Sequence, residues 1–152
     1  MKKHHFRMES YLKIKEFEEK LSWTEVLSQM NRVTTIVQKI TQLKNQQKTI
    51  RKNISMIGQN QGPQIYELSL AGESIEGTKV KIENLLLEQR NEEKILERLR
   101  LKHIESKKDL KTIEKLKEND LRNFKIDRDK KDLKTTSEIA LQMYNREKAE
   151  NE

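Results

Sequence analysis

The three histidines are the side chains of this chain best suited to bind a metal ion or to transfer a proton near neutral pH. His4 and His5 are adjacent, so they cannot both face one metal from a helix, where paired ligands stand three or four residues apart. His103 falls at a position of the heptad pattern described below, where a polar layer between two helices is its ordinary role. The absence of cysteine excludes disulfides, thiolate metal sites and a thiol nucleophile. We therefore predict no metal and no cofactor.

No sequence motif of an enzyme is present. The chain has no glycine-rich phosphate loop, no G-x-S-x-G and no H-E-x-x-H. Carboxylates are abundant, but a helical surface exposes many of them to solvent without giving them a chemical role. A pair of helices also offers no concave apolar cleft for a substrate. We expect no catalytic residue.

Basic residues gather in the first part of the chain. Residues 1–62 carry 12 Lys and Arg against 5 Asp and Glu, whereas residues 63–152 carry 20 of each. Two basic clusters stand out, residues 2–7 and the group of Lys48, Arg51 and Lys52. Such a surface favours acidic partners. Nucleic-acid binding would call for a concentrated stripe with aromatic or amide readers, so we do not expect nucleic acid as the partner.

The composition fits helices and little else. Of 152 residues, 33% are hydrophobic and 38% charged, too few apolar side chains for a layered core in a chain long enough for one domain. A long helical or coiled-coil protein and a disordered one both remain compatible with these numbers. There is no signal-peptide core and no run of about 18 apolar residues. We expect a cytoplasmic protein without a transmembrane segment.

Helix breakers are confined to one window. All four glycines and the single proline fall between residues 58 and 77. This predicts a single coiled-coil domain over 1–152, with a first helical arm over about 4–57, a bend over 58–77 and a second arm over about 78–148. Within the bend, Pro63 suits the start of a short helix that ends near Ala71. Gly72 and Gly77 would loosen or break it, and the sequence leaves open whether residues 64–77 are continuous with the second helix.

The first arm carries apolar residues in the 3-4 alternation of a coiled coil. The two heptad positions are filled by Val26, Val33, Ile40, Gln47 and Ile54, and by Ile36, Leu43, Ile50 and Ile57. Upstream, Ile14, Phe17 and Leu21 keep the spacing in another register. This predicts a register change around residues 21–26, near Trp23.

The second arm repeats the pattern with polar layers between apolar ones. The apolar positions are Ile82, Leu85, Leu96, Leu99, Leu110, Ile113 and Phe124, and the polar ones are Gln89, Glu92, His103, Ser106, Lys117 and Asp120. Such a seam is marginal in stability. Because the second arm is the longer, the predicted fold is an all-α, antiparallel two-helix coiled-coil hairpin with a longer, protruding C-terminal helix, monomeric when isolated.

Two segments near the ends resemble the flagellar FliJ family. Residues 6–19 (FRMESYLKIKEFEE) are similar to the N-terminal F-R-L-E-S motif of that family, followed by its glutamate-rich turn. Residues 114–140 match without gaps: EKLKE at 114–118, an aromatic at Phe124, a basic-basic-acidic run at 130–132 and E-I-A at 138–140, with Tyr144 at the later aromatic. Departures from the family pattern are Leu133 for Gln, Thr136 for Leu and Ser137 for Asp.

The resemblance implies a non-enzymatic component of the flagellar type III protein export apparatus. Members of the family are hairpins similar to the central stalk of rotary ATPases. They insert the end that holds both termini into the hexameric export ATPase FliI, contact the export gate protein FlhA and handle export chaperones. The chain would then be associated with the cytoplasmic face of the inner membrane through these partners. The residues implied as partner contacts are Arg7, Lys13, Lys15, Phe124, Lys130 and Lys131.

Three other functions fit the sequence. A generic coiled-coil adaptor or tether would homodimerise without an ATPase partner, although the glycines and Pro63 disfavour the continuous seam of a parallel dimer. A basic helical nucleic-acid binder would lose affinity steeply as salt rises. The equivalent stalk of a virulence type III secretion system is a variant of the first hypothesis, and the F-R-M-E-S opening favours the flagellar branch.

Overall fold

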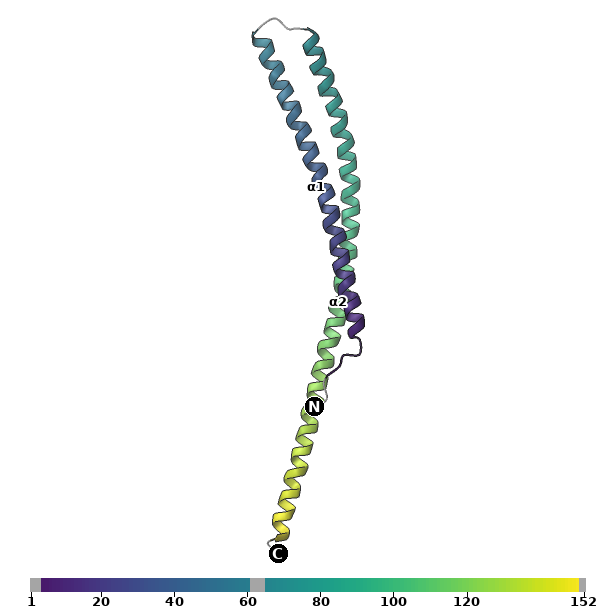
Figure 1. Cartoon of the computed structure of the whole chain (residues 1–152), viewed down its shortest axis with the longest axis vertical. Helices are drawn as coiled ribbons and strands as arrows, with labels where there is room; N and C mark the ends of the chain where they lie inside the picture. Colours follow the sequence, from purple (N-terminus) through teal and green to yellow (C-terminus); the bar gives the residue numbers. More distant parts are fainter. Residues whose placement is uncertain (1–3, 61–64, 151–152) are drawn as a thin grey trace. The chain divides into compact units, whose positions relative to one another are not determined.

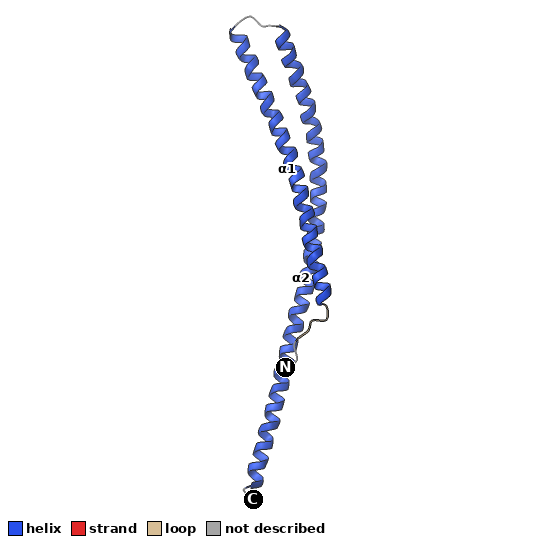
Figure 2. Cartoon of the chain, viewed as in Figure 1, coloured by secondary structure: helices blue, strands red, loops and turns tan. Residues whose placement is uncertain are grey.

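Two long helices make up the computed structural model, which describes residues 4–60 and 65–150, with the side chains of 57–60 and 150 left aside. Helix α1 spans Glu9–Asn60 and helix α2 spans Ile65–Glu150 (Figure 1). No strand occurs among these described residues (Figure 2). The all-α prediction with two long, packed helices is confirmed.

The chain divides into two compact units, each built from both helices. We call Lys20–Glu105 the central unit, and Met1–Glu19 with Ser106–Glu152 the terminal unit. In each unit, a residue that lies later in the first part of the chain contacts a residue that lies earlier in α2, which is the order of an antiparallel pair. The contacts are 4 with 120, 9 with 117 and 15 with 109 in the terminal unit, and 22 with 103, 29 with 92 and 47 with 75 in the central unit.

The central unit packs along the predicted heptad seam. Its core contains Ile36, Ile40 and Ile82, with Leu43 and Leu85 against them. The remaining predicted positions with described side chains are buried or half-buried in α1: Val26, Val33, Gln47, Ile50 and Ile54. The apolar seam of the first arm is therefore confirmed from Val26 to Ile54, and Ile57 lies outside the described side chains.

Polar layers separate the apolar ones in the central unit. The Ser22 hydroxyl lies 3.0 Å from Nδ1 of His103, and the Trp23 ring lies 5.2 Å from the His103 ring. The side-chain amide of Gln29 donates to the backbone carbonyl of Glu92 at 3.1 Å and also to its carboxylate. The prediction that His103 forms a polar layer between helices is confirmed.

The terminal unit has a smaller core. Phe6, Leu12 and Ile113 are buried together, with Leu110 packed against them. Phe6 precedes α1, and its carbonyl accepts a hydrogen bond from the Glu9 amide at 3.2 Å, which turns the chain into the helix. The first helix therefore begins at Glu9, five residues later than the predicted start near residue 4, because residues 4–8 fold onto α2 instead.

The predicted register change near Trp23 is wrong. The residues of α1 that face α2 upstream of Val26 are Leu12, Lys15, Glu19 and Ser22, all buried or half-buried, and they keep the heptad grid of the downstream seam. Ile14, Phe17 and Leu21 are 53%, 67% and 49% exposed. Polar side chains occupy the packed face of α1 here because residues of α2 pair with them, as Asp109 does with Lys15.

The structure decides whether the helix continues through Gly72 and Gly77, which the sequence left open. Helix α2 begins at Ile65 and continues through both glycines, so residues 65–77 belong to the second helix and not to a bend with a short helix. Neither glycine has a positive φ. A glycine costs an 86-residue helix about 1 kcal/mol relative to alanine, too little to stop it. The predicted helix start at Pro63 lies outside the described residues.

Candidate protein-binding surface

All six residues that the sequence singled out as partner contacts lie in the terminal unit, and the structure separates them into two groups. Lys15 and Phe124 are engaged within the unit. Arg7, Lys13, Lys130 and Lys131 are exposed, and none of these four forms a salt bridge with another described residue. Only the second group is free to meet a partner without first breaking an internal contact.

Lys15 occupies the interface between the helices. Its ammonium lies 2.8 Å from the carboxylate of Glu18 and 3.6 Å from that of Asp109, with the Tyr11 ring 5.5 Å away. The hydrogen bond to Glu18 is the main reason that the pKa of Lys15 is raised, against a smaller opposing effect of burial. Its charge is thus already balanced inside the unit.

Phe124 packs on the residue that precedes the N-terminal turn. Its ring lies 5.1 Å from the ring of His4, and Nε2 of His4 lies 2.9 Å from the carboxylate of Asp120. Phe124 is half-buried, and every later residue of α2 with a described side chain is exposed. Phe124 therefore closes the packed part of the terminal unit.

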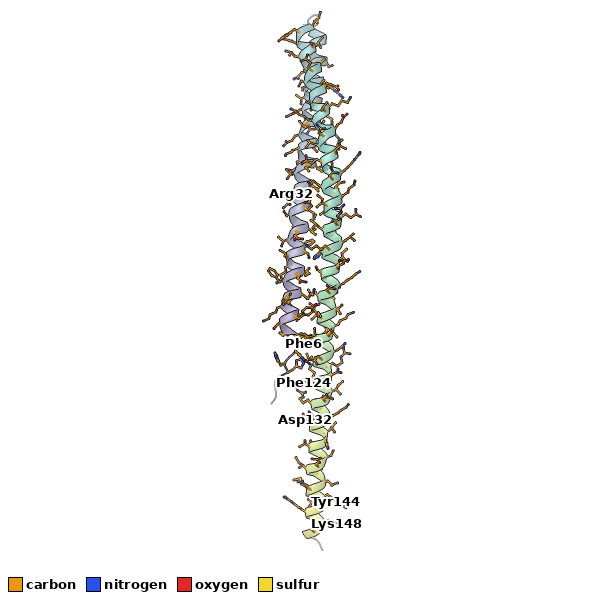
Figure 3. All side chains as sticks on the ribbon, turned by 90° about the vertical axis from the view of Figure 1, so that its right-hand side faces the viewer. Phe6, Arg32, Phe124, Asp132, Tyr144 and Lys148 are labelled. Atoms are coloured by element: carbon orange, nitrogen blue, oxygen red, sulfur yellow. The ribbon has the colours of Figure 1, made fainter. Side chains whose placement is uncertain are left out.

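The segment of α2 from Lys125 to Ala149 is exposed at every residue. Figure 3 shows the side chains of Asp132, Tyr144 and Lys148 standing out from this part of the helix. The segment contains large apolar side chains with high exposure: Ile126 at 45%, Leu133 at 68% and Tyr144 at 65%. Exposed apolar groups on a charged helix mark a surface that a partner can cover.

These apolar residues form one line along the helix. Ile126, Leu133, Ala140 and Tyr144 follow one another at intervals of seven, seven and four residues, which places them on one face. We call these four residues the C-terminal apolar line. The line begins at Ile126, two residues after Phe124. Two residues turn the helix by about 200°, so the line faces away from the side of α2 that contacts α1. The seven-residue spacing is present in the sequence. It is hard to recognise there because most residues between these positions are charged.

A second apolar surface of the terminal unit was also missed. Ile14 and Phe17 were expected to face the partner helix, but both point to solvent on α1. They stand three residues apart and so share a helix face. Their apolar character was noted from the sequence, whereas their exposure follows from the register that Leu12 and Lys15 adopt.

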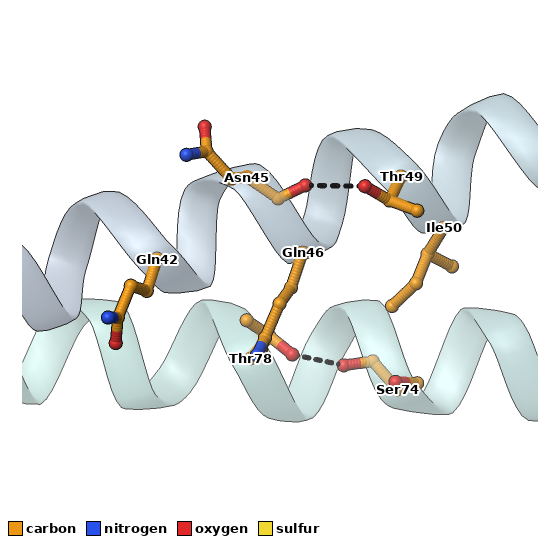
Figure 4. Close-up of a pocket in the computed structure, with 7 residues that line it drawn as sticks. All are labelled: Gln42, Asn45, Gln46, Thr49, Ile50, Ser74 and Thr78. Atoms are coloured by element: carbon orange, nitrogen blue, oxygen red, sulfur yellow. Dashed lines mark hydrogen bonds between the residues drawn. The ribbon is translucent and has the colours of Figure 1, made fainter.

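The central unit contains a groove between the helices with a largely polar, uncharged lining. It is lined by Gln42, Asn45, Gln46, Thr49, Ile50, Ser74 and Thr78 (Figure 4). The hydroxyls of Thr49 and Thr78 donate to the carbonyls of Asn45 and Ser74 at 3.1 and 2.7 Å, within their own helices. No side chain that lines this groove titrates near neutral pH. Across residues 4–60 and 65–150, no group of three metal-ligating side chains comes together.

Neither helix contains, over its described length, a stretch both long and apolar enough to cross a lipid bilayer. Comparison with known proteins finds no family model that matches the chain, and no curated protein or solved structure that is similar to it. The resemblance to the FliJ family therefore rests on the two terminal motifs of the sequence, and the partners that it implies stay predictions.

Proposed function

We propose that this chain is a non-enzymatic stalk of the flagellar type III protein export apparatus. In this proposal, the terminal unit enters the hexameric export ATPase, and the chain links the ATPase to the export gate protein and to export chaperones. The site of action would be the cytoplasm, at the inner face of the inner membrane. The proposal includes a C-terminal helix that protrudes past its partner helix.

The observation that carries the proposal is the exposed segment from Lys125 to Ala149, in the same unit as the N-terminal turn. Twenty-five consecutive helical residues without a buried side chain leave a helix that tertiary packing does not stabilise. The C-terminal apolar line gives this helix one face suited to contact a protein surface. A ring lumen would supply such a surface around a single helix.

The charges of the terminal unit suit a role in orientation rather than tight binding. Lys130 and Lys131 lie within the exposed segment, and Arg7 and Lys13 lie at the start of the chain. Exposed cations steer association and set the register between partners more than they add affinity. Lys15 and Phe124 contribute indirectly, because Lys15 pairs with Asp109 of α2 and Phe124 packs on His4.

Stimulation of ATP hydrolysis by the hexameric export ATPase tests the proposal. We expect the full chain to stimulate hydrolysis, the double variant Leu133→Ser/Tyr144→Ser to need about tenfold more protein for half-maximal stimulation, and Lys130→Glu/Lys131→Glu to weaken it likewise. The matched control is Ile139→Ser/Met143→Ser, which changes two equally exposed apolar residues, 52% and 63%, that lie off the C-terminal apolar line. Stimulation that is absent, or equally weakened by the control, contradicts the proposal.

A coiled-coil tether that homodimerises is the second candidate, because the heptad spacing of the C-terminal apolar line also fits pairing with a second copy. Sedimentation equilibrium separates the two. The stalk requires a monomer when isolated. A dimer that the Leu133→Ser/Tyr144→Ser variant abolishes would favour the tether instead.

A further inference from the structure

The first helix carries a long stretch without any acidic residue. Between Glu25 and Glu67 there is no Asp or Glu, while six cations occur: Arg32, Lys39, Lys44, Lys48, Arg51 and Lys52. In a chain where 38% of residues are charged, the two signs are mixed almost everywhere else. All six cations belong to the central unit, whereas the surface used in the proposed function belongs to the terminal unit.

No ion pair with another residue of 4–60 or 65–150 engages any of these six cations. Each of the six is exposed. Acidic residues are available on the neighbouring helix, since residues 65–93 of α2 carry seven Glu against three Lys and Arg. Glu76, for example, pairs with Lys79 of its own helix. Arg32 and Lys39 line a groove together with Glu88 and Glu92 of α2. The other four cations are therefore the ones most available to an external anion.

Four of the cations share one face. Lys44, Lys48, Arg51 and Lys52 stand at positions i, i+4, i+7 and i+8 of α1, which places them in one ladder along the helix. Successive rungs at 44, 48 and 52 are separated by a rise of about 6 Å. A partner helix with glutamate or aspartate at every fourth position repeats with the same rise. The cations of the ladder are therefore spaced at the same distance as the acidic residues of such a helix.

From this match we propose that the ladder of Lys44, Lys48, Arg51 and Lys52 is a docking surface for an acidic helix of a partner protein. Single-stranded nucleic acid fits less well, because the stretch between Trp23 and Tyr66 offers no aromatic ring for stacking. A duplex would extend over the net acidic residues 65–93 of α2 and be repelled there. A membrane surface would require bulky exposed apolar side chains between the cations, and the one apolar residue there, Ile50, is half-buried in the seam.

The binding of a labelled acidic peptide to the full chain tests this docking surface. The probe is an alanine-based helical peptide of about 20 residues with glutamate at every fourth position, long enough to hold helical structure. A second peptide of the same composition spreads its glutamates around the helix. Fluorescence anisotropy at low salt is the readout, and unlabelled duplex DNA is the competitor. Circular dichroism confirms that each protein variant is as helical as the parent.

We expect the variant Lys44→Gln/Lys48→Gln/Lys52→Gln to weaken binding of the first peptide by about tenfold, since each exposed ion pair contributes a factor of about two. The matched control is Arg90→Gln/Lys94→Gln/Arg98→Gln, which removes three exposed cations at the same spacing from a helix face where acids are interspersed. Its affinity should stay within about twofold. Equal loss in both variants, equal binding of the two peptides, or displacement by duplex DNA at lower concentration than by unlabelled peptide would overturn the proposal.

Discussion

The carboxylate of Glu9 lies 2.8 Å from the ammonium of Lys117, a residue 108 positions later in the chain. This ion pair and that of Lys15 with Asp109 connect the two helices of the terminal unit around a core of three buried side chains. Both pairs are partly exposed, so each adds little free energy of unfolding. Their main effect is to fix which residues of α1 and α2 stand opposite one another.

Acid should weaken the terminal unit through Glu9. The pKa of this carboxyl is below its ordinary value of 4.5, first because Lys117 donates a hydrogen bond to it. A carboxyl whose pKa is lower when folded stabilises the fold fully above pH 4.5, and this contribution disappears as the pH falls through the lower folded-state pKa. The difference in Tm between the parent chain and Glu9→Gln should therefore shrink between about pH 6 and about pH 3. Thermal unfolding followed by circular dichroism measures it, and a constant difference would contradict this assignment.

The register of the terminal unit is tested by two apolar residues five positions apart. Leu12 is 5% exposed and Phe17 is 67% exposed. Replacement of a buried leucine by alanine costs about 2–4 kcal/mol of unfolding free energy. We expect this loss for Leu12→Ala and a change within about 0.5 kcal/mol for Phe17→Ala, in urea unfolding experiments. A larger loss of unfolding free energy for Phe17→Ala than for Leu12→Ala would contradict this register and support the one that the sequence alone suggested.

The sequence predicts the seam well where one apolar pattern is clearly the longest. From Val26 to Ile54 the seam residues continue over four heptads, whereas the other apolar residues of this stretch, Leu27, Met30 and Val37, cover only part of it and are exposed. Upstream, Ile14, Phe17 and Leu21 present an equally regular apolar pattern, and the packed face instead contains Lys15, Glu19 and Ser22. What decides between them is the polar layer on α2 at His103 and Asp109. These partners lie 81 residues from Ser22 and 94 residues from Lys15 along the chain, beyond any local pattern.

The candidate site was likewise predictable from the sequence only in part. Composition and the terminal motifs point to cations near both ends of the chain. They do not separate Lys13 from Lys15, although one is exposed and the other balanced by Glu18 and Asp109. A shift of two residues moves a side chain by about 200° around the helix axis. A small error in register therefore exchanges exposed side chains with those that face α2.

The glycines of α2 give a direct test of helix continuity. A Cβ added at Gly72 or Gly77 would meet nothing within 4 Å. Since both glycines lie inside a helix, Gly72→Ala and Gly77→Ala should each raise the unfolding free energy by about 0.5–1 kcal/mol. The contrasting variant is Gly72→Pro, which should cost about 3 kcal/mol inside a helix. Urea unfolding measures all three, and a proline variant as stable as the parent would place a bend at this position after all.

The last prediction concerns the polar layer of Gln29 and Glu92. Gln29 is 6% exposed, and its amide hydrogen-bonds both the carbonyl and the carboxylate of Glu92. Gln29→Leu leaves a half-buried carboxylate without its donor, which should cost about 1–3 kcal/mol. Gln29→Leu/Glu92→Leu removes both polar groups and buries two leucines, so we expect it to exceed the parent in stability by about 1–3 kcal/mol. A double-mutant cycle in urea gives both values.

If the double variant is less stable than either single variant, the Gln29–Glu92 layer is needed to pack the helices together and not only to satisfy its own hydrogen bonds. If the double variant is more stable, as expected, then the polar layer lowers the stability of the central unit while it specifies the pairing. Only one arrangement of α1 on α2 brings the Gln29 amide to Glu92, whereas leucine layers tolerate a shift of one heptad. The seam would then be weak because its register is specified by polar groups, and the same variant should show more than one register by cross-linking between the helices.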